Sequence, residues 1–472
     1  MNKPRVLIII SIQFTVRILI RSSFAKNIKK YVNPVIVLSW VDQNFQNELE
    51  SMGFEVHITR KNQFSKKHRH LRNKINYVWN KMFLQSFSIS LDNDIEDALY
   101  PKTIIQMLLK LIIRVYWNIK YIFLRQYDSL INEEEKIFFN DSNVIAMEKE
   151  IVEYGIDLVI SLTPYNIHDE FILRIAKKHN IPIFISYLSF DNIIAYGRVP
   201  VIADFYTLWN RFNKEQLLRA YSDSSNSRIE IVGPPQFDFY YDETNLWKEK
   251  YWREKLSLPI ERPVILFGAG YYKIVPNEHH WLKQLDDAIE NDEIKGNPII
   301  LFRIHPVDPI DRWEPILKNA KHIIFDEPWK SDSIQKGAAN IEKKDIEKLV
   351  SSLFHSSVHI NASSTMTVDG AIFDRPQIGP AYDDMYDKKY DKIVKDLYRR
   401  EHFIPILKSG GLELAFSREE LIKLINTAFE NPNKLSSQRK TMVKEICTYS
   451  DGESINRTEE VFKSFLKSRG LI

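Results

Sequence analysis

Cysteine is nearly absent from the chain, which contains a single one, Cys447, among 472 residues. One cysteine excludes a disulfide framework and also a zinc site built on cysteine ligands. An excess of one charge is missing as well, because 65 Lys and Arg oppose 62 Asp and Glu and leave a net charge of +3. Nucleic-acid-binding proteins normally carry a stronger basic excess, so we expect no nucleic-acid partner.

A secretory signal is also missing. The apolar run Val6–Ile10 lies near the N-terminus, but it is short and no small-residue cleavage site follows it. We expect this run to form the buried first strand of a parallel sheet, and we expect the protein to be cytoplasmic.

Metal-binding patterns are weak. The pairs His68 with His70 and His279 with His280 have no supporting carboxylate or thiolate pattern nearby in the sequence. Metal sites in proteins need several such ligands together. The sequence therefore predicts no metal site, and no cofactor is expected.

The composition that remains is that of a globular protein, with 44% hydrophobic and 27% charged residues. The chain is too long for one compact core, and two α/β domains of roughly 200 residues each are expected. Short apolar runs alternate with helical patterns, which predicts parallel sheets with crossover helices. The predicted strands are Val6–Ser11, Val35–Trp40, Glu55–Thr59, Leu158–Leu162, Pro182–Leu188, Phe205–Trp209, Ile229–Val232, Val264–Phe267, Ile299–Ile304, Ile323–Phe325, Val358–Ile360 and Gln377–Ile378.

The predicted architecture is therefore α/β, with two Rossmann-like, doubly wound domains facing across a cleft. The first domain should span residues 1–240 and carry a helical insert at about 61–142. A charged segment with Pro259 and Pro263 at its end predicts a linker with a short helix at 241–262. The second domain should span 263–448, and a last helix within 449–472 is expected to pack back on the first domain.

The strongest candidate site follows the predicted strand that ends at Asn361. Ser363, Ser364 and Thr365 come next, and a helix should begin at about Ser364. Free N–H groups and the helix dipole at such a start suit a diphosphate. Asp369, about one turn further on, is placed to accept hydrogen bonds from a ribose. The alternative is that Ser363 or Ser364 merely caps the helix.

Two further strand ends should converge on this donor site, because ligands of open α/β sheets bind at the carboxyl ends of the strands. Gly268 and Gly270 follow the first strand of the second domain, where glycine lets a phosphate approach the backbone, although a tight turn is an equal alternative. Arg303 and His305 end the next strand on one face and offer two donors to a leaving diphosphate, with His305 also a candidate catalytic group.

The first domain has its own strand-end loop, in which Ser189 and Asn192 are expected on the acceptor side. Asp191 could take a proton from an acceptor hydroxyl and is the predicted general base of an inverting reaction. His168 is the next candidate. The alternative is an Asx turn, in which Asp191 and Asn192 only shape the loop.

The order of these motifs resembles bacterial GT-B transferases, namely capsule or surface-polysaccharide glycosyltransferases and CDP-glycerol glycerophosphotransferases. The resemblance covers about Leu158 to the C-terminus, and two positions depart from it: Phe190 stands where Trp is usual, and Asp369 where Glu is usual. The residues that carry it are Ser189–Asn192, Gly233–Asp238, His305–Pro306, Asn361–Thr365 with Asp369 and Pro376, and Asp451–Arg457.

The resemblance implies a metal-independent glycosyltransferase that binds its donor in the C-terminal domain and its acceptor in the N-terminal domain. A UDP-sugar is the first expectation for the donor, and a glycan or lipid-linked acceptor of surface-polysaccharide synthesis is expected. A transferase of the CDP-glycerol type moving a polyol phosphate is the alternative within the same resemblance. A sugar-nucleotide epimerase would share the two-domain fold, and a non-enzymatic nucleotide-sugar-binding protein is a third class.

A glycosyltransferase of the GT-A type is a further alternative. It would need a metal-binding Asp-x-Asp after a strand, and Asp92–Asp94 matches as a string. This string lies in the helical insert, however, and a GT-A protein would have only one Rossmann-like unit.

A helix of the insert, at about residues 103–125, is hypothesised to contact a membrane surface. Lys110, Arg114 and Arg125 follow one stripe with Asn118 and Tyr121, while apolar residues fill the rest. A basic amphipathic helix with Trp and Tyr suits an anionic lipid interface. The alternative is an ordinary helix packed on the first domain.

Overall fold

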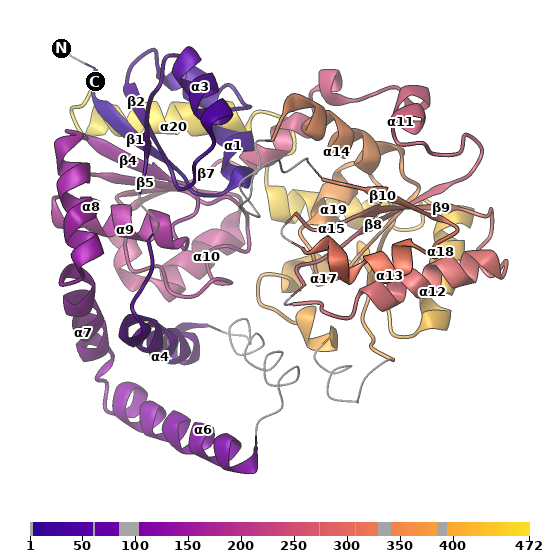
Figure 1. Ribbon diagram of the computed structural model, residues 1–472, viewed down its shortest axis with the longest axis horizontal. Coiled ribbons are helices and arrows are strands. Elements are labelled where there is room, and N and C mark those ends of the chain that lie inside the picture. Colours follow the sequence, from indigo (N-terminus) through magenta and orange to yellow (C-terminus); the bar gives the residue numbers. More distant parts are fainter. Residues whose placement is uncertain are drawn as a thin grey trace. The chain divides into compact units, whose positions relative to one another are not determined.

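The computed structural model describes residues 3–59, 62–84, 103–272, 274–306, 308–328, 341–384 and 394–472. The described residues form two compact units (Figure 1). The first consists of the chain up to Pro235 together with Ser454–Ile472, and the second consists of Gln236–Glu453.

The first unit is built on a seven-stranded sheet in the order β3-β2-β1-β4-β5-β6-β7, in which every neighbouring pair is parallel. Val, Ile, Leu and Phe dominate the central strands, as expected where helices cover both faces of a parallel sheet. The strands are β1 Arg5–Ile10, β2 Asn33–Leu38, β3 Glu55–Ile58, β4 Leu158–Ser161, β5 Ile183–Ser186, β6 Phe205–Leu208 and β7 Arg228–Ile231.

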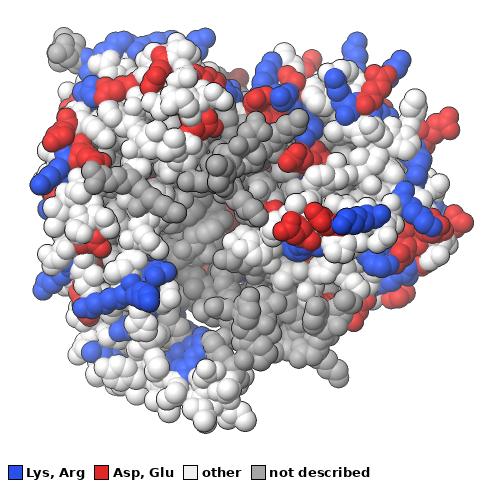
Figure 2. All heavy atoms as spheres, viewed as in Figure 1, with Lys and Arg blue, Asp and Glu red and all other residues white. Residues whose placement is uncertain are grey.

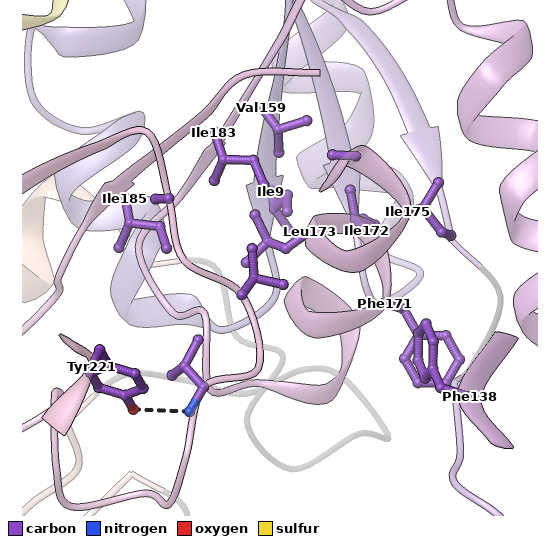
Figure 3. Close-up of a cluster of buried hydrophobic side chains, with 14 of the residues drawn as sticks. Ile9, Phe138, Val159, Phe171, Ile172, Leu173, Ile175, Ile183, Ile185 and Tyr221 are labelled. Atoms are coloured by element: carbon purple, nitrogen blue, oxygen red, sulfur yellow. Dashed lines mark hydrogen bonds between the residues drawn. The ribbon is translucent and has the colours of Figure 1, made fainter. Parts of the chain in front are cut away.

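The core of this unit lies between the sheet and its crossover helices (Figure 3). Ile9, Val159 and Ile183 come from three adjacent strands, and each is at most 1% exposed. Phe171 of α9 packs edge-on against Phe138 of α7, with ring centroids 4.9 Å apart. The unit's helices are α1 Gln13–Leu19, α2 Phe24–Ile28, α3 Gln43–Ser51, α4 Lys66–Phe83, α6 Ile104–Trp117 continued by the π-helical turn η1 Asn118–Phe123, α7 Tyr127–Phe139, α8 Ser142–Glu153, α9 Ile167–Lys178, α10 Arg211–Ala220 and α20 Ser454–Ser468.

The second unit repeats the plan with a six-stranded parallel sheet in the order β10-β9-β8-β11-β12-β13. Its strands are β8 Val264–Gly268, β9 Ile299–Arg303, β10 Ile323–Asp326, β11 Val358–Asn361, β12 Gln377–Pro380 and β13 Leu412–Ala415. Its helices are α11 Glu249–Lys255, α12 His279–Glu290, α13 Glu314–Leu317, α14 Lys343–His355, α15 Met366–Ile372, α17 Ile404–Ser409, α18 Arg418–Glu430 and α19 Ser436–Cys447. The prediction of two Rossmann-like, doubly wound units is confirmed, and all twelve predicted strands are present within one to two residues at each end.

The last helix, α20, is part of the first unit although it follows the second in sequence. Phe462 lies against Phe24 of α2, at 6.1 Å between ring centroids, and edge-on against Phe184 of β5, at 5.2 Å. Burial of this aromatic ring, which is 0% exposed, is worth about 2–3 kcal/mol and fixes the helix on the sheet.

The segment expected to be a linker is folded into the second unit. Trp252 of α11 is fully buried, and its indole N–H donates to Ser352 of α14 at 3.2 Å. The boundary between the units falls after Pro235, earlier than the sequence predicts. The charged residues and prolines of this segment suggested a linker. Of the residues of α11, only Trp252 is buried, so the helix has a mostly polar sequence.

Candidate functional site

The second sheet changes winding direction between β8 and β11, which are adjacent, with Gly268 paired to Asn361. From β8 the chain moves outward to β9 and β10, and from β11 it moves the other way to β12 and β13. In open α/β sheets, ligands bind in the crevice outside the carboxyl ends of strands at such a switch point. The loops after β8 and β11, which were predicted from the sequence to form the donor site, both lie at this switch point.

The loop after β11 turns sharply into α15. Ser363 has a left-handed backbone, with φ of 45°, and its hydroxyl donates to the Leu397 carbonyl at 3.0 Å. The Ser364 hydroxyl accepts from the Met366 N–H at 3.2 Å, which caps the helix. Among the described residues, the backbone N–H groups of Ser364 and Thr365 have no hydrogen-bond partner. The helix begins at Met366, two residues later than predicted, and these two N–H groups precede it.

Asp369 lies on the first turn of α15 and is 8% exposed. It accepts a hydrogen bond from the hydroxyl of Tyr240, which comes from the short helical segment Pro235–Tyr240. Tyr240 could not be predicted as a partner of Asp369, because nothing in the local sequence indicates that two residues 129 positions apart will pair. A ribose-binding role for Asp369 stays a prediction, and Tyr240 fixes the direction of its carboxylate.

The two glycines after β8 have different reasons for being glycine. A Cβ on Gly268 would lie 2.6 Å from the sulfur of Met366, so the first residue of α15 packs directly on this strand end. Gly270 donates its N–H to the Glu278 carboxylate at 2.8 Å. Gly268 thus makes room for Met366, and Gly270 donates within the fold. The approach of a phosphate to either glycine stays a prediction.

A buried acid–base cluster next to these glycines was not anticipated from the sequence. Glu278, at the start of α12, is 1% exposed and accepts from Arg312 at 3.1 Å. Arg312 also pairs with Asp308 at 3.0 Å. Burial raises the pKa of Glu278 to about 8, against the lowering effect of Arg312. The cluster ties the loop after β8 to the segment after β9.

Arg303 forms contacts within the second sheet. Its side chain is buried, and its guanidinium donates to Asp326 of β10 at 2.5 Å and to the Pro328 carbonyl at 3.3 Å. Lys348 reaches the same carboxylate at 2.9 Å. In this structure the charge of Arg303 is thus paired with Asp326 of the adjacent strand, and its role toward a departing phosphate stays a prediction.

His305 is half-buried at the end of β9, with its ring 5.7 Å from that of Tyr271 after β8. Burial lowers the pKa of His305 to about 4, so the imidazole is neutral at physiological pH. A neutral ring can donate one N–H to a phosphate oxygen, and a bound anion would favour its protonated form.

In the first unit, the loop after β5 is shaped by Asn192. Its side-chain oxygen accepts from the Ser189 N–H at 3.0 Å and from the Tyr165 hydroxyl at 3.1 Å, and its amide donates to Asp191 at 3.1 Å. These contacts match the loop-shaping alternative, and a contact of Asn192 with the acceptor stays a prediction. Asp191 is half-buried, and the Ser189 hydroxyl is buried with no partner among the described residues.

An aromatic pair lies beside this loop. Tyr165 stacks on Tyr196 with ring centroids 4.2 Å apart and an interplanar angle of 9°. Tyr196 is 58% exposed, and such an exposed ring is suited to contact with the apolar face of a sugar or polyol. The stacking of Tyr165 on Tyr196 could not be predicted from the sequence, because many other tyrosines and aromatic residues are present in the chain.

The first sheet has its own switch point, between β1 and β4, and it carries buried hydroxyls around one carboxyl group. Ser161 and Thr163 donate to Asp169 at 2.6 and 3.2 Å, and Ser11 contacts Thr163 at 3.0 Å. Burial raises the pKa of Asp169 to about 7. Asp169 follows the last residue of β4 by eight positions, as Asp369 follows the last residue of β11. This repeated spacing could have identified Asp169 from the sequence. His168, the second base candidate, is half-buried on the same first turn of α9.

The string Asp92–Asp94 lies outside the described residues. Within them, no group of three or more His, Cys, Asp or Glu side chains is arranged to hold a metal ion. The presence of two doubly wound units contradicts the GT-A alternative, which expects one.

Comparison with known proteins places this geometry in a family. A profile for CDP-glycerol:poly(glycerophosphate) glycerophosphotransferases matches residues 198–463, and a comparison with curated sequences found no match. Solved structures share the fold at low identity. The UDP-GlcNAc 2-epimerase from Neisseria meningitidis bound to UDP-GlcNAc is 12% identical, with a TM-score of 0.54 over 98% of this chain and 100% of that one.

Two transferases are similar to the same degree. A glycosyltransferase from Rickettsia africae is 14% identical, with a TM-score of 0.52 over 99% of this chain and 100% of its own. The wall teichoic acid polymerase TagF is 13% identical, with a TM-score of 0.51 over 99% and 90%. These likenesses establish the GT-B fold. Because the family profile matches more than half of this chain, the chain belongs to the CDP-glycerol:poly(glycerophosphate) glycerophosphotransferase family, whose members are transferases.

Proposed function

We propose that this chain transfers a polyol phosphate from a nucleotide-activated donor to a hydroxyl group of a surface polymer. Membership of a glycerophosphotransferase family supports the transferred group. The observation that carries the donor site is the switch point of the second sheet, where the loops after β8 and β11 meet.

The donor's diphosphate would lie against the start of α15. The N–H groups of Ser364 and Thr365 and the Thr365 hydroxyl are donors suited to phosphate oxygens. His305, neutral when the site is empty, would add a further donor and become more basic beside the anion. Asp369, held by Tyr240, would accept from the ribose hydroxyls.

The chemistry follows from the donor's bonds. An acceptor hydroxyl oxygen attacks the β-phosphorus of a CDP-polyol, a new P–O bond forms, and the P–O bond to the α-phosphate breaks. The nucleoside monophosphate leaves, and the hydroxyl proton passes to a base. Asp191 is our candidate for that base, because it is a half-buried carboxylate at a strand end of the first unit.

Glycosyl transfer is the second candidate, favoured by the Ser189–Asn192 loop that resembles surface-polysaccharide glycosyltransferases. There the acceptor attacks the anomeric carbon, the C–O bond to the β-phosphate breaks, and a nucleoside diphosphate leaves. The two reactions thus differ in their leaving group.

The experiment incubates the full chain with CDP-glycerol or a UDP-sugar, with and without a hydroxyl-terminated poly(glycerophosphate) primer, and separates the nucleotides by chromatography. Primer-dependent, multiple-turnover release of CMP supports the proposal. Primer-dependent UDP release supports glycosyl transfer instead. Conversion of the sugar without nucleotide release indicates an epimerase, and binding without turnover overturns both transferase assignments.

A further inference from the structure

A pocket of about 450 Å³ lies in the first unit, between α7, α9 and the segment that leads into β6. This volume is within the range of small-molecule sites, roughly 300–1,000 Å³. One wall is apolar, with Ile131 and the ring of Phe139 from α7 and with Pro200 and Val201 from the segment before β6. We call this cavity the α7–α9 pocket, after the two helices that provide most of its lining.

The α7–α9 pocket lies away from the loops that follow the strands. Helix α9 begins after β4 and runs back to the start of β5, so Lys177 and Lys178 on its last turn lie toward the amino ends of the strands. Pro200 and Val201 come shortly before β6 in the chain and approach the same ends. The candidate donor and acceptor loops follow the carboxyl ends, where ligands of open α/β sheets bind. The proposed transfer reaction therefore does not account for this pocket.

Two of the four cations that line the pocket are paired within the fold. Arg174 is buried and donates to Glu134 at 2.7 and 3.0 Å. Lys178 forms an ion pair with Glu148 at 2.7 Å. Burial would raise the pKa of Glu134, but hydrogen bonds from His68 and Arg174 lower it to about 2, so positive charge prevails around this carboxylate.

The other two cations, Lys177 and Arg198, form no side-chain hydrogen bond or ion pair with any described residue. Elsewhere Lys and Arg atoms commonly lie beside Asp and Glu atoms, as Figure 2 shows on the second unit. Arg198 is half-buried, so its guanidinium loses part of its hydration without a carboxylate in return. An anion from outside the chain would supply this missing partner.

The backbone of Arg198 is held from both sides by α4. Its N–H donates to the side chain of Asn76 at 3.0 Å, and its carbonyl accepts from Arg72 at 3.1 Å. Arg72 in turn pairs with Glu170 of α9 at 3.0 Å. Because the backbone is fixed in this way, Arg198 loses less conformational entropy when its guanidinium binds an anion.

The charges of the pocket suit a single phosphate group. A phosphate monoester carries about −1.5 to −2 charges at pH 7, which two unpaired cations balance, and a guanidinium can bind two of its oxygens. Glu135 is exposed at the pocket and has no cation partner among the described residues, so it disfavours a ligand with more negative charge. Its carboxylate can accept from hydroxyl groups, and the Phe139 ring suits the apolar face of a sugar.

We propose that the α7–α9 pocket binds a small sugar phosphate or polyol phosphate that carries one phosphate group. Arg198 and Lys177 hold the phosphate, Glu135 accepts from the hydroxyls, and the apolar wall covers the carbon chain. This ligand is distinct from the donor and the acceptor of the proposed transfer, and the inference does not depend on that reaction.

The test is titration calorimetry of the full chain with glucose 6-phosphate and with glycerol 3-phosphate, in the presence of CDP to occupy a nucleotide site elsewhere. We expect saturable binding of both monoesters and no binding of glucose or glycerol. R198Q should weaken binding at least about tenfold, by the loss of a charge-assisted hydrogen bond. K177Q changes an exposed side chain and should weaken it about two- to fivefold. E135A should lower the affinity for glucose 6-phosphate relative to inorganic phosphate by about two- to tenfold.

The matched control is K136Q, which removes the same charge from an exposed residue of α7 outside the pocket lining. It should bind both monoesters like the parent. Absence of saturable binding by the parent up to about 10 mM overturns the proposal. So does unchanged affinity in both R198Q and K177Q, which would place the phosphate elsewhere, an equal loss in K136Q, which would indicate net charge alone, or an unchanged affinity ratio in E135A, which would exclude the hydroxyl contact. The titrations contain no acceptor, so none of these results bears on the transfer reaction.

Discussion

Gly370 of α15 is the position where the packing of the donor-site helix can be tested most sharply. A Cβ added there would lie 2.1 Å from Nδ1 of His359 and 2.2 Å from Nε2 of Gln377. Both side chains are 2% exposed, lie on β11 and β12, and hydrogen-bond to each other at 3.2 Å. Ordinary contact needs about 3.5 Å, so G370A should push α15 away from the sheet by about 1.4 Å.

The magnitude follows from two opposing effects. Alanine gains about 1 kcal/mol over glycine in helix propensity. Overpacking of a buried site costs up to about 3 kcal/mol. We therefore expect a net loss of about 2 kcal/mol in the free energy of unfolding of the second unit, which is a fall of about 4–8 °C in Tm. Nucleotide affinity should fall as well, because the loop before α15 moves with the helix.

Differential scanning calorimetry measures the first effect, and titration calorimetry with CDP measures the second. The control is the same substitution in a H359A background, where the nearest obstacle is gone and G370A should cost distinctly less. An increase in Tm for G370A, or an identical cost in both backgrounds, would show that α15 does not pack against β11 as described.

Three other variants test separate parts of the site. D191N should lower turnover by about two to four orders of magnitude with donor affinity nearly unchanged, measured by steady-state kinetics; near-normal turnover would mean that Asp191 only shapes its loop. Y240F should lower the free energy of unfolding by about 1–3 kcal/mol in urea titrations, because the buried Asp369 loses the hydrogen bond that Tyr240 donates, and an unchanged midpoint would refute that contact. Burial raises the pKa of Glu278 to about 8, so the stability contributed by its protonated form is complete below about 4.5 and is lost as the pH rises to 8. E278Q cannot titrate, so relative to the parent it should gain a few kcal/mol in stability between pH 5 and pH 8, and a pH-independent difference would contradict the raised pKa.

Most of the architecture could be predicted because buried parallel strands are nearly continuous apolar runs. Strands such as Arg5–Ile10 and Val264–Gly268 carry this signal clearly. Strand β13, Leu412–Ala415, was not predicted, because it is short and its two middle residues are only half-buried. The short helix expected in the linker is present as α11, but its packing into the second unit could not be predicted, because its burial depends on a single tryptophan.

The candidate site was predictable in position but not in detail. Strand-end loops can be located from the sequence, and those after β8 and β11 do meet. The partners of individual side chains could not be predicted, because pairs such as Arg303 with Asp326 and Glu278 with Gly270 are chosen by the packed fold. The sequence shows that Arg303 ends β9, but it does not show that Asp326 of the adjacent strand β10 pairs with this charge.

The claim that a nucleotide donor binds before α15 is tested most directly by titration calorimetry of the full chain with CDP-glycerol. The variant that removes a donor from this loop is T365P. Thr365 has φ of −61°, which proline also adopts, so the substitution removes its N–H and hydroxyl without changing the backbone angle. A proline at 364 would instead strain Ser363 before it, which has a left-handed backbone. S437P, in the first turn of α19, is the matched control. We predict that the parent and S437P bind CDP-glycerol alike and that T365P binds at least about tenfold more weakly at an unchanged Tm, by the loss of a charge-assisted hydrogen bond. Equal affinity for all three would place the donor site elsewhere.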